Sequence, residues 1–346
     1  MNPEKPLKGT VLLDIEKTLE INPYKFEEVG FKHFRFARDA DGEVILLGIN
    51  QTEVHRFTQN GEYLGSLVRK GQGPGEFPDF SGLQIYFMNH QIWITGRHKL
   101  AQFDKNGQFI QEKKLGYNPE PLINDRHFFV DKKRLSPEKS EQKILLVDLS
   151  PEGPNKEKET LLFQAENVGM IWGPERRGLM EDWATPFILN SYDKENQKAY
   201  IVLNTDYKIH VKNLKAETLY VIEKPHKNVR VDLDDKKEIL SRYLERGESS
   251  KWMLSAYPDA LVAIKDLKIL PGGFVAVYRV AGLKIFEIDV FDKEGNYLYV
   301  MKPPEGVSLE NAEFYNFGFA LTEMTEDGFQ IYVEYRIKNL PDIFKD

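Results

Sequence analysis

A short pattern recurs along this sequence. A strand-like run ends in Phe, a Gly follows four residues later in a polar turn, and an aromatic–aliphatic pair resumes the strand. The copies span residues 56–64, 102–110 and 290–298, and a weaker copy spans 149–153. Glycine takes a positive φ at little steric cost, so each copy predicts a β-hairpin. Gly61, Gly107 and Gly153 are spaced by 46 residues. A fixed period of about 40–50 residues in an all-β chain is typical of propeller blades.

A second turn signal comes about 20 residues before most of these glycines, which places two hairpins in each period. Two hairpins give four antiparallel strands, the content of one blade. The second turns are Asp41-Gly42, Asn89-His90 and Gly272-Gly273, and Glu326-Asp327-Gly328 has the same character near the C-terminus. Runs such as Val44–Leu47 are continuously apolar, as expected of strands covered on both faces. The sequence therefore predicts an all-β fold.

Counting the turns predicts six blades. Gly61, Gly107, Gly153, a turn near Lys215 and Gly295 mark five outer hairpins, and Gly328 opens a sixth blade. The last blade then lacks an outer strand. Residues 10–15 are strand-like and have no partner of their own, so we expect this N-terminal strand to close the ring and remove the free sheet edges. We expect residues 1–346 to form a single propeller domain.

The period is interrupted twice, by inserts of roughly 16 and 34 residues if each blade takes about 46. The first insert falls near residues 167–182 and the second near 225–258. The second contains the one convincing helical segment, Asp232 to Glu245, which begins with several Asp residues and is followed by Gly247. Those are the residues expected at helix ends. We therefore predict one helical insert, between blades 4 and 5.

The residues that follow the first hairpin resemble those of a known family. Residues 68–77, Val-Arg-Lys-Gly-Gln-Gly-Pro-Gly-Glu-Phe, are similar to the linker of bacterial six-bladed propellers of the NHL-repeat type, and the blade-ending motif is similar too. The resemblance covers about residues 34–115 and 285–300. It implies the propeller architecture and, because such proteins are common among Bacteroidetes-like exported proteins, a periplasmic or cell-surface location with the leader absent from this chain. It implies no activity, since relatives include RNA-binding domains and metal-dependent lyases and lactonases.

Composition narrows the possible functions. The chain has 346 residues, a formal net charge of −7 and no cysteine. The negative charge disfavours nucleic acid as a partner, and the lack of cysteine excludes disulfides and thiolate metal sites. No apolar run approaches the roughly 18 residues of a membrane-spanning helix. A closed ring needs no partner to cover its edges, so we expect a monomer.

Few residues point to catalysis or to a bound metal. Gly71, Gly73 and Gly75 superficially resemble a phosphate loop, but Pro74 interrupts them and no Gly-Lys-Ser/Thr follows, so we interpret the segment as a blade linker. The seven histidines lack metal-ligand spacing, and we expect His55 and His98 to be polar strand or loop residues. We predict no cofactor, although a Ca or Zn ion held in the central channel by several blades stays possible from sequence alone.

The inserts carry the candidate binding residues. Loops on a rigid scaffold commonly carry recognition, and Trp and Arg together suit carboxylates, sugars or peptides. The candidates are Trp172, Arg176, Arg177, Trp183, Arg246 and Trp252. We expect a non-catalytic binding or scaffold propeller that recognises a peptide, glycan or protein through the face with the inserts. The alternative is a metal-dependent hydrolase or lyase with its site in the central channel. Alternatively, Trp172 and Trp252 pin the inserts to the propeller.

Overall fold

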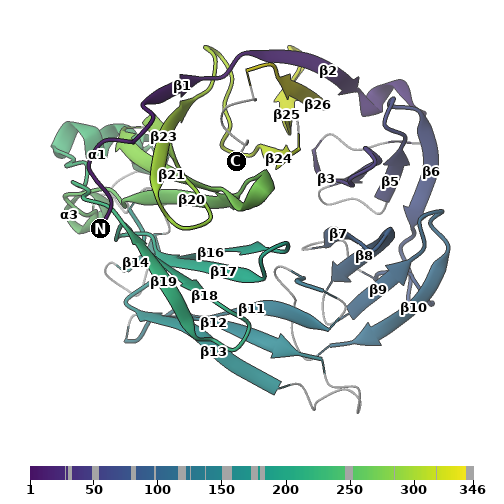
Figure 1. Cartoon of the computed structure of the whole chain (residues 1–346), viewed down its shortest axis with the longest axis horizontal. Helices are drawn as coiled ribbons and strands as arrows, with labels where there is room; N and C mark the ends of the chain where they lie inside the picture. Colours follow the sequence, from purple (N-terminus) through teal and green to yellow (C-terminus); the bar gives the residue numbers. More distant parts are fainter. Residues whose placement is uncertain are drawn as a thin grey trace.

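The computed structural model describes residues 1–27, 29, 33–48, 54–78, 83–96, 99–115, 122–124, 126–136, 138–149, 158–172, 178–179, 184–245, 252–283, 285–316 and 318–339. Strands in these residues form six blades around a central axis (Figure 1). The prediction of an all-β six-bladed propeller is confirmed. Helices are few and short.

Blades 1, 2 and 4 each have four antiparallel strands that follow one another along the chain, from the centre outwards. Blade 1 contains β3 (Phe34–Arg38), β4 (Val44–Gly48), β5 (Val54–Phe57) and β6 (Tyr63–Val68). Blade 2 contains β7 (Gln84–Met88), β8 (Gln91–Gly96), β9 (Lys99–Phe103) and β10 (Phe109–Lys114). Blade 4 contains β16 (Ile188–Asp193), β17 (Lys198–Leu203), β18 (Lys208–Lys212) and β19 (Thr218–Glu223).

Blade 3 has three strands in the described part of the chain: β11 (His127–Arg134), β12 (Glu141–Asp148) and β13 (Lys158–Glu166). A single antiparallel bridge joins Leu122 to Phe128 on the inner side of β11. The predicted turn at Gly153 falls between β12 and β13, but its residues lie outside those described.

The N-terminus contributes strands to two blades. Blade 5 contains β20 (Ile264–Ile269), β21 (Val275–Gly282), β22 (Ile285–Phe291) and β23 (Tyr297–Lys302). Blade 6 contains β24 (Glu313–Tyr315), β25 (Gly318–Met324) and β26 (Gln330–Ile337). Its outer strand is β2 (Ile15–Ile21), antiparallel to β26, so an N-terminal strand does close the ring. However, we expected residues 10–15 in that place. Instead β1 (Thr10–Leu12) pairs with β23 in parallel, as a fifth strand of blade 5.

Adjacent blades pack through apolar residues that cover both faces of the inner strands. Val44, Ile45 and Leu46 of β4 are fully buried, which explains why that strand lacks an apolar–polar alternation. Phe77 of the first linker is also buried, in the cluster between blades 1 and 2. The turn glycines Gly61, Gly107 and Gly295 have positive φ values, as the hairpin pattern predicts.

Two long connections interrupt the blades. The first lies between β13 and β16 and contains the hairpin β14 (Ile171–Trp172) and β15 (Gly178–Leu179). The second lies between β19 and β20 and contains α1 (Leu233–Ile239), α2 (Ser241–Leu244) and α3 (Trp252–Ala256). Asp232 caps α1 in a capping box with Asp235. Leu240 separates α1 from α2, so the predicted helix is interrupted there. Two 3-10 turns, Pro23–Lys25 and Pro271–Gly273, complete the described elements.

Candidate functional site

The blade-to-blade connections that carry the inserts all reach one face of the ring. Each leads from the outer strand of one blade to the first residue of the next inner strand. The first insert enters β16, the second enters β20, and the linker with Gly71 and Phe77 enters β7. In a blade of four antiparallel strands, the outer strand ends at the same end of the blade at which the inner strand begins. The connections from one blade to the next therefore share a face of the ring. We call it the insert face.

A cavity of about 410 Å³ lies beside the first residues of β3, β7 and β24, and therefore towards the insert face. This volume is in the range of small-molecule sites. Residues of blades 1, 2 and 6 line it: Phe34, Arg35, Phe36, Leu47, Leu83, Gln84, Ile85, Tyr86, Asn311, Glu313, Thr322 and Gln330. We call it the channel-mouth cavity.

Two side chains of opposite charge line this cavity. Arg35 of β3 and Glu313 of β24 are both exposed to water. Within the described residues, neither takes part in an ion pair. The surrounding protein raises the pKa of Glu313 to about 7, because it replaces much of the water that would stabilise the carboxylate, and the charge of Lys268 only partly opposes this. The cavity thus offers a guanidinium and a carboxyl group that titrates near neutrality.

Lys268 of β20 holds the segment that leads to Glu313. Its Nζ donates to the carbonyl oxygens of Ala312 at 2.8 Å and Glu310 at 3.1 Å. It also lies 3.4 Å from the carboxylate of Asp266, whose pKa is raised mainly by burial. Lys268 donates to these oxygens, and no described residue forms an ion pair with the Glu313 carboxyl group, which lines the cavity.

The second insert starts at a buried charged network, the Asp289 network, between blades 4 and 5. Asp289 is fully buried and accepts hydrogen bonds from Tyr207 at 2.6 Å, Tyr297 at 2.7 Å and Lys224 at 2.7 Å. The Nε of Arg279 lies 3.1 Å from the same carboxylate. Burial lowers the pKa of Lys224 and the charge of Asp289 opposes that shift. Because Lys224 follows β19 directly, the network fixes the point where the insert leaves blade 4.

His226 lies beside this network, two residues into the insert. Burial and the positive charges of Arg279 and Lys224 lower its pKa to about 4, so it is neutral at pH 7. Its ring lies 5.7 Å from that of Tyr207.

The helices of the insert pack on a small apolar cluster of their own. Leu240 and Tyr257 of the insert are buried there with Val280 of β21. Lys236 of α1 donates to the carbonyl oxygen of Tyr257 at 2.8 Å and pairs with Asp259. Figure 1 shows α1 and α3 at the periphery, near the strands of blade 5. The insert is therefore seated against the propeller.

Of the predicted binding residues, only Trp252 has a described side chain. It is half-buried at the start of α3 and packs against the same apolar cluster, and its buried Nε1 has no hydrogen-bond partner among the described residues. That environment fits the pinning role weighed for it. Trp172 lies in β14, which places its backbone on the first insert. The remaining candidates, Arg176, Arg177, Trp183 and Arg246, lie outside the described residues.

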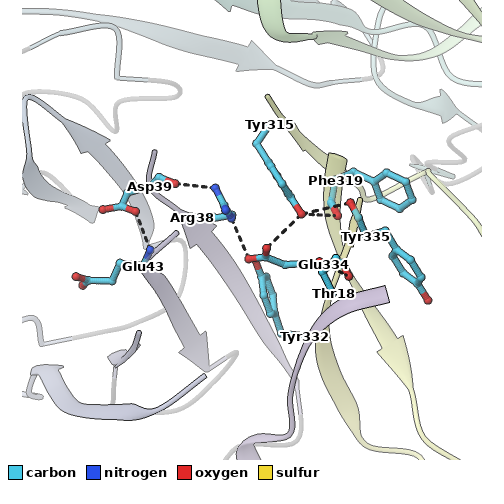
Figure 2. Close-up of polar contacts among 9 residues, drawn as sticks. All are labelled: Thr18, Arg38, Asp39, Glu43, Tyr315, Phe319, Tyr332, Glu334 and Tyr335. Carbon is cyan, nitrogen blue, oxygen red and sulfur yellow. Dashed lines mark hydrogen bonds and ion pairs between the residues drawn. The ribbon is translucent and has the colours of Figure 1, made fainter. Parts of the chain in front are cut away.

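A second buried carboxylate lies between blades 6 and 1, where the ring closes. Glu334 of β26 accepts from the Nε of Arg38 at 2.9 Å and from the hydroxyl of Tyr332 at 2.7 Å (Figure 2). The hydroxyl of Tyr315 lies 3.2 Å from it, and the Arg38 guanidinium lies 4.0 Å from the centre of the Tyr315 ring. Thr18 of β2 donates to the Glu334 carbonyl oxygen. We call this the Glu334 cluster, and it links four strands at the closure: β2, β3, β24 and β26.

The phosphate-loop resemblance has a structural explanation. The Glu76 carboxylate accepts from the Gly73 amide at 2.9 Å, and Glu112 accepts from the Gly75 amide at 3.0 Å. The backbone donors are thus taken by carboxylates. His55 is a buried residue of β5, with Nδ1 3.0 Å from the Tyr63 hydroxyl, whereas His98 lies outside the described residues. In the described part of the chain, no three His, Asp or Glu side chains gather as a metal site.

Comparison with known proteins agrees with this architecture. Residues 27–170 match the family model DUF5128, described as a 6-bladed beta-propeller. A DUF4221 family member from Bacteroides vulgatus is similar in structure, with a TM-score of 0.55 and 10% identity over 94% of this chain and 99% of that one. A candidate exported protein from Bacteroides fragilis has a TM-score of 0.48 and 11% identity, covering 97% of this chain and all of that one. Virginiamycin B lyase from Staphylococcus aureus has a TM-score of 0.43 and 9% identity, over 93% and 99% of the two chains.

The family model and the similarity to the Bacteroides vulgatus structure agree with the six-bladed fold. At such low identity they transfer no activity, since one propeller scaffold supports many functions. Among curated proteins, none matches the chain by sequence. The helices within the described residues are all too short or too polar to cross a membrane.

Sequence reasoning missed Arg35, Glu313 and Asp289. The chain has 54 acidic and 47 basic residues, so composition singles out none of these three. The position of a residue along its inner strand could have pointed to two of them. Arg35 and Glu313 occupy the first or second position of their inner strands, where side chains from several blades meet. Finding them required knowing where each inner strand begins.

Proposed function

We propose that this chain is a non-catalytic binding propeller that recognises a peptide, glycan or protein through the insert face. One observation carries the proposal: both inserts and the channel-mouth cavity lie towards the same face, and the Asp289 network seats the helical insert there. A rigid scaffold that presents long connections on the same face as a cavity of small-molecule size is suited to recognition. The six tryptophan and arginine candidates on the inserts are the proposed contacts.

A thermal-shift screen tests this proposal. The wild-type chain is heated with a panel of oligosaccharides and peptides, and a ligand present at 100 times its Kd stabilises by about 2.7 kcal/mol, which raises the Tm by several degrees. The triple variant Arg176→Ala/Arg177→Ala/Arg246→Ala should lose that shift. The matched control Lys113→Ala/Lys114→Ala removes positive charge from β10, on the outer rim, and should keep it.

Two results contradict the proposal. A ligand whose thermal shift survives in the triple variant binds somewhere other than the insert residues. A ligand that is recovered chemically altered, as judged by mass spectrometry, shows that the chain is an enzyme.

We also propose that the repeats are of the NHL type and that the protein works outside the cytoplasm. Both rest on the resemblance of residues 68–77 and of the blade-ending motif to exported propellers of that type. Fractionation of the source cells, followed by immunodetection, tests the location. Recovery in the cytoplasmic fraction contradicts it.

A further inference from the structure

The two charges of the channel-mouth cavity do not neutralise each other. In the described part of the chain Arg35 has no ion pair, and the only cation acting on Glu313 is Lys268, which donates to backbone oxygens. The other polar groups of the cavity, among them Asn311 and Thr322, are uncharged. A neutral sugar would leave both charged groups without a partner. A ligand with one charge of each sign would satisfy both.

We propose that the channel-mouth cavity binds a small zwitterion, a free amino acid or short peptide, with its carboxylate on Arg35 and its ammonium group on Glu313. This inference rests on the proposed function, because it names the ligand class recognised at the insert face. The planar guanidinium of Arg35 suits bidentate binding of a carboxylate. Phe34, Phe36 and Tyr86 supply the apolar walls that such a small site needs.

The direction of the pH dependence follows from the charges. An ammonium group binds the ionised form of Glu313, so affinity should rise as the pH rises through the pKa of that carboxyl, about 7. A ligand with a carboxylate alone should bind more weakly over the same interval, because ionised Glu313 repels it. The charged and titratable groups around Glu313 lie on β3, β7, β20 and the connection before β24. They are Arg35, Tyr86, Lys265, Asp266, Lys268 and Glu310.

Isothermal titration calorimetry with trialanine tests the inference, and two capped peptides serve as matched probes. N-acetyl-trialanine lacks the ammonium group, and trialanine amide lacks the carboxylate. We expect trialanine to bind at least about tenfold more tightly than either capped form, since each lost charge pair is a charge-assisted hydrogen bond. Between about pH 5.5 and 7 its affinity should rise on the order of tenfold, while the peptide amine, with a pKa near 8, stays protonated.

Variants assign the two ends of the ligand. Arg35→Gln should make trialanine and its amide bind alike, and Glu313→Gln should abolish both the preference for a free amine and the pH dependence. Arg134→Gln and Glu305→Gln remove exposed charges outside the cavity and should change nothing.

The proposal is overturned if trialanine fails to bind at millimolar concentration, or if the capped peptides bind as tightly. These failures differ from failure of the proposed function. A ligand from the thermal-shift screen that depends on the insert arginines, together with no binding of trialanine, keeps the binding propeller and removes only the zwitterion.

Discussion

The junction of blades 4 and 5 and the junction of blades 6 and 1 are each crossed by a carboxylate that contacts two tyrosine hydroxyls and an arginine. At the first junction Asp289 is fully buried and also binds Lys224, and the neighbouring blade supplies two of its partners. At the second, Glu334 retains 7% exposure, and the neighbouring blade supplies only Arg38. The first junction thus depends on a dry, multiply charged network. The second has a simpler ion pair. There the pairing of β2 with β26 already joins the N-terminal and C-terminal parts of the chain.

This difference indicates which interactions stabilise each junction. A buried charge without its partner is costly, whereas a charge that water reaches is less so. Main-chain pairing between β2 and β26 supports the closure independently of Glu334. Among the described residues, blades 4 and 5 are joined by an apolar cluster and by isolated hydrogen bonds, such as those from the Ala263 and Ile264 amides to the Asn204 carbonyl oxygen. The Asp289 network adds buried charged contacts to this junction and to the foot of the helical insert.

The largest expected effect is therefore at Asp289. Asp289→Asn leaves Lys224 buried without its carboxylate, whereas Arg279 keeps its pair with Glu287, and we expect the free energy of unfolding to fall by about 3–5 kcal/mol. Urea unfolding followed by tryptophan fluorescence measures it. If the variant does not fold, Tyr207→Phe, which removes one hydrogen bond to a charge, should lose about 2 kcal/mol. A loss below about 0.5 kcal/mol in either variant, the range of ordinary surface substitutions, contradicts the comparison.

Glu334→Gln should cost less, about 2 kcal/mol, because the glutamine keeps an acceptor and water reaches Arg38. Hydrogen exchange should accelerate in β2 and β3 but not in α1, whereas Asp289→Asn should accelerate it in α1. Glu20→Gln, at an exposed position of β2, is the control. Equal losses from the Asp289 and Glu334 variants would show that the two junctions are alike.

Glu313 offers a third carboxyl for comparison, with no arginine or tyrosine partner among the described residues. Its folded pKa, about 7, lies above the ordinary value of 4.5, so folding favours its neutral form. The wild-type chain should lose stability relative to Glu313→Gln as the pH rises from about 4.5 to 7 and lose no more above that. Because water reaches this side chain, the effect should be smaller than either above. A Tm difference that is flat with pH contradicts the raised pKa.

The smallest effect is expected at Trp252. Its indole N–H makes no hydrogen bond to the described residues, so Trp252→Phe removes only part of a half-buried ring, and stability should fall by at most about 1 kcal/mol. Calorimetric unfolding measures this loss. If thermal-shift ligands lose affinity while stability stays the same, Trp252 contacts ligand; if only stability falls, it pins the insert.

Much of the architecture could be predicted because it is local. Gly61 and Gly107 mark hairpins through their own backbone conformation, and their spacing gives the blade repeat. The place of the inserts follows from the same period. The closing strand was misplaced by a few residues, because residues 10–15 and Ile15–Ile21 are both strand-like. The three-dimensional arrangement decides between them: β1 pairs with the free edge of β23 in blade 5, and β2 pairs with the free edge of β26 in blade 6.

The sites could not be predicted in the same way because they are not local. Tyr207 and Asp289 are 82 positions apart, and Arg38 and Glu334 are 296 apart. Which carboxylate meets which cation depends on the side-by-side placement of blades, and no pattern within one repeat encodes it. The Trp and Arg residues of the inserts were chosen as candidates by residue type alone. Arg35 and Glu313 line the channel-mouth cavity because of their positions along β3 and β24, which residue type does not reveal.

The N-terminal segment has a consequence for how the chain folds. The Asn2 amide donates to the Glu223 carbonyl oxygen of blade 4, β1 pairs with blade 5 and β2 pairs with blade 6, so these early segments find their main-chain partners among residues far later in the sequence. During synthesis β2 must wait, unpaired, until β26 leaves the ribosome. Contacts so distant in sequence slow folding, and incomplete rings expose strand edges to other chains. Ring closure is therefore expected to be the last and slowest step, and the one most vulnerable to aggregation.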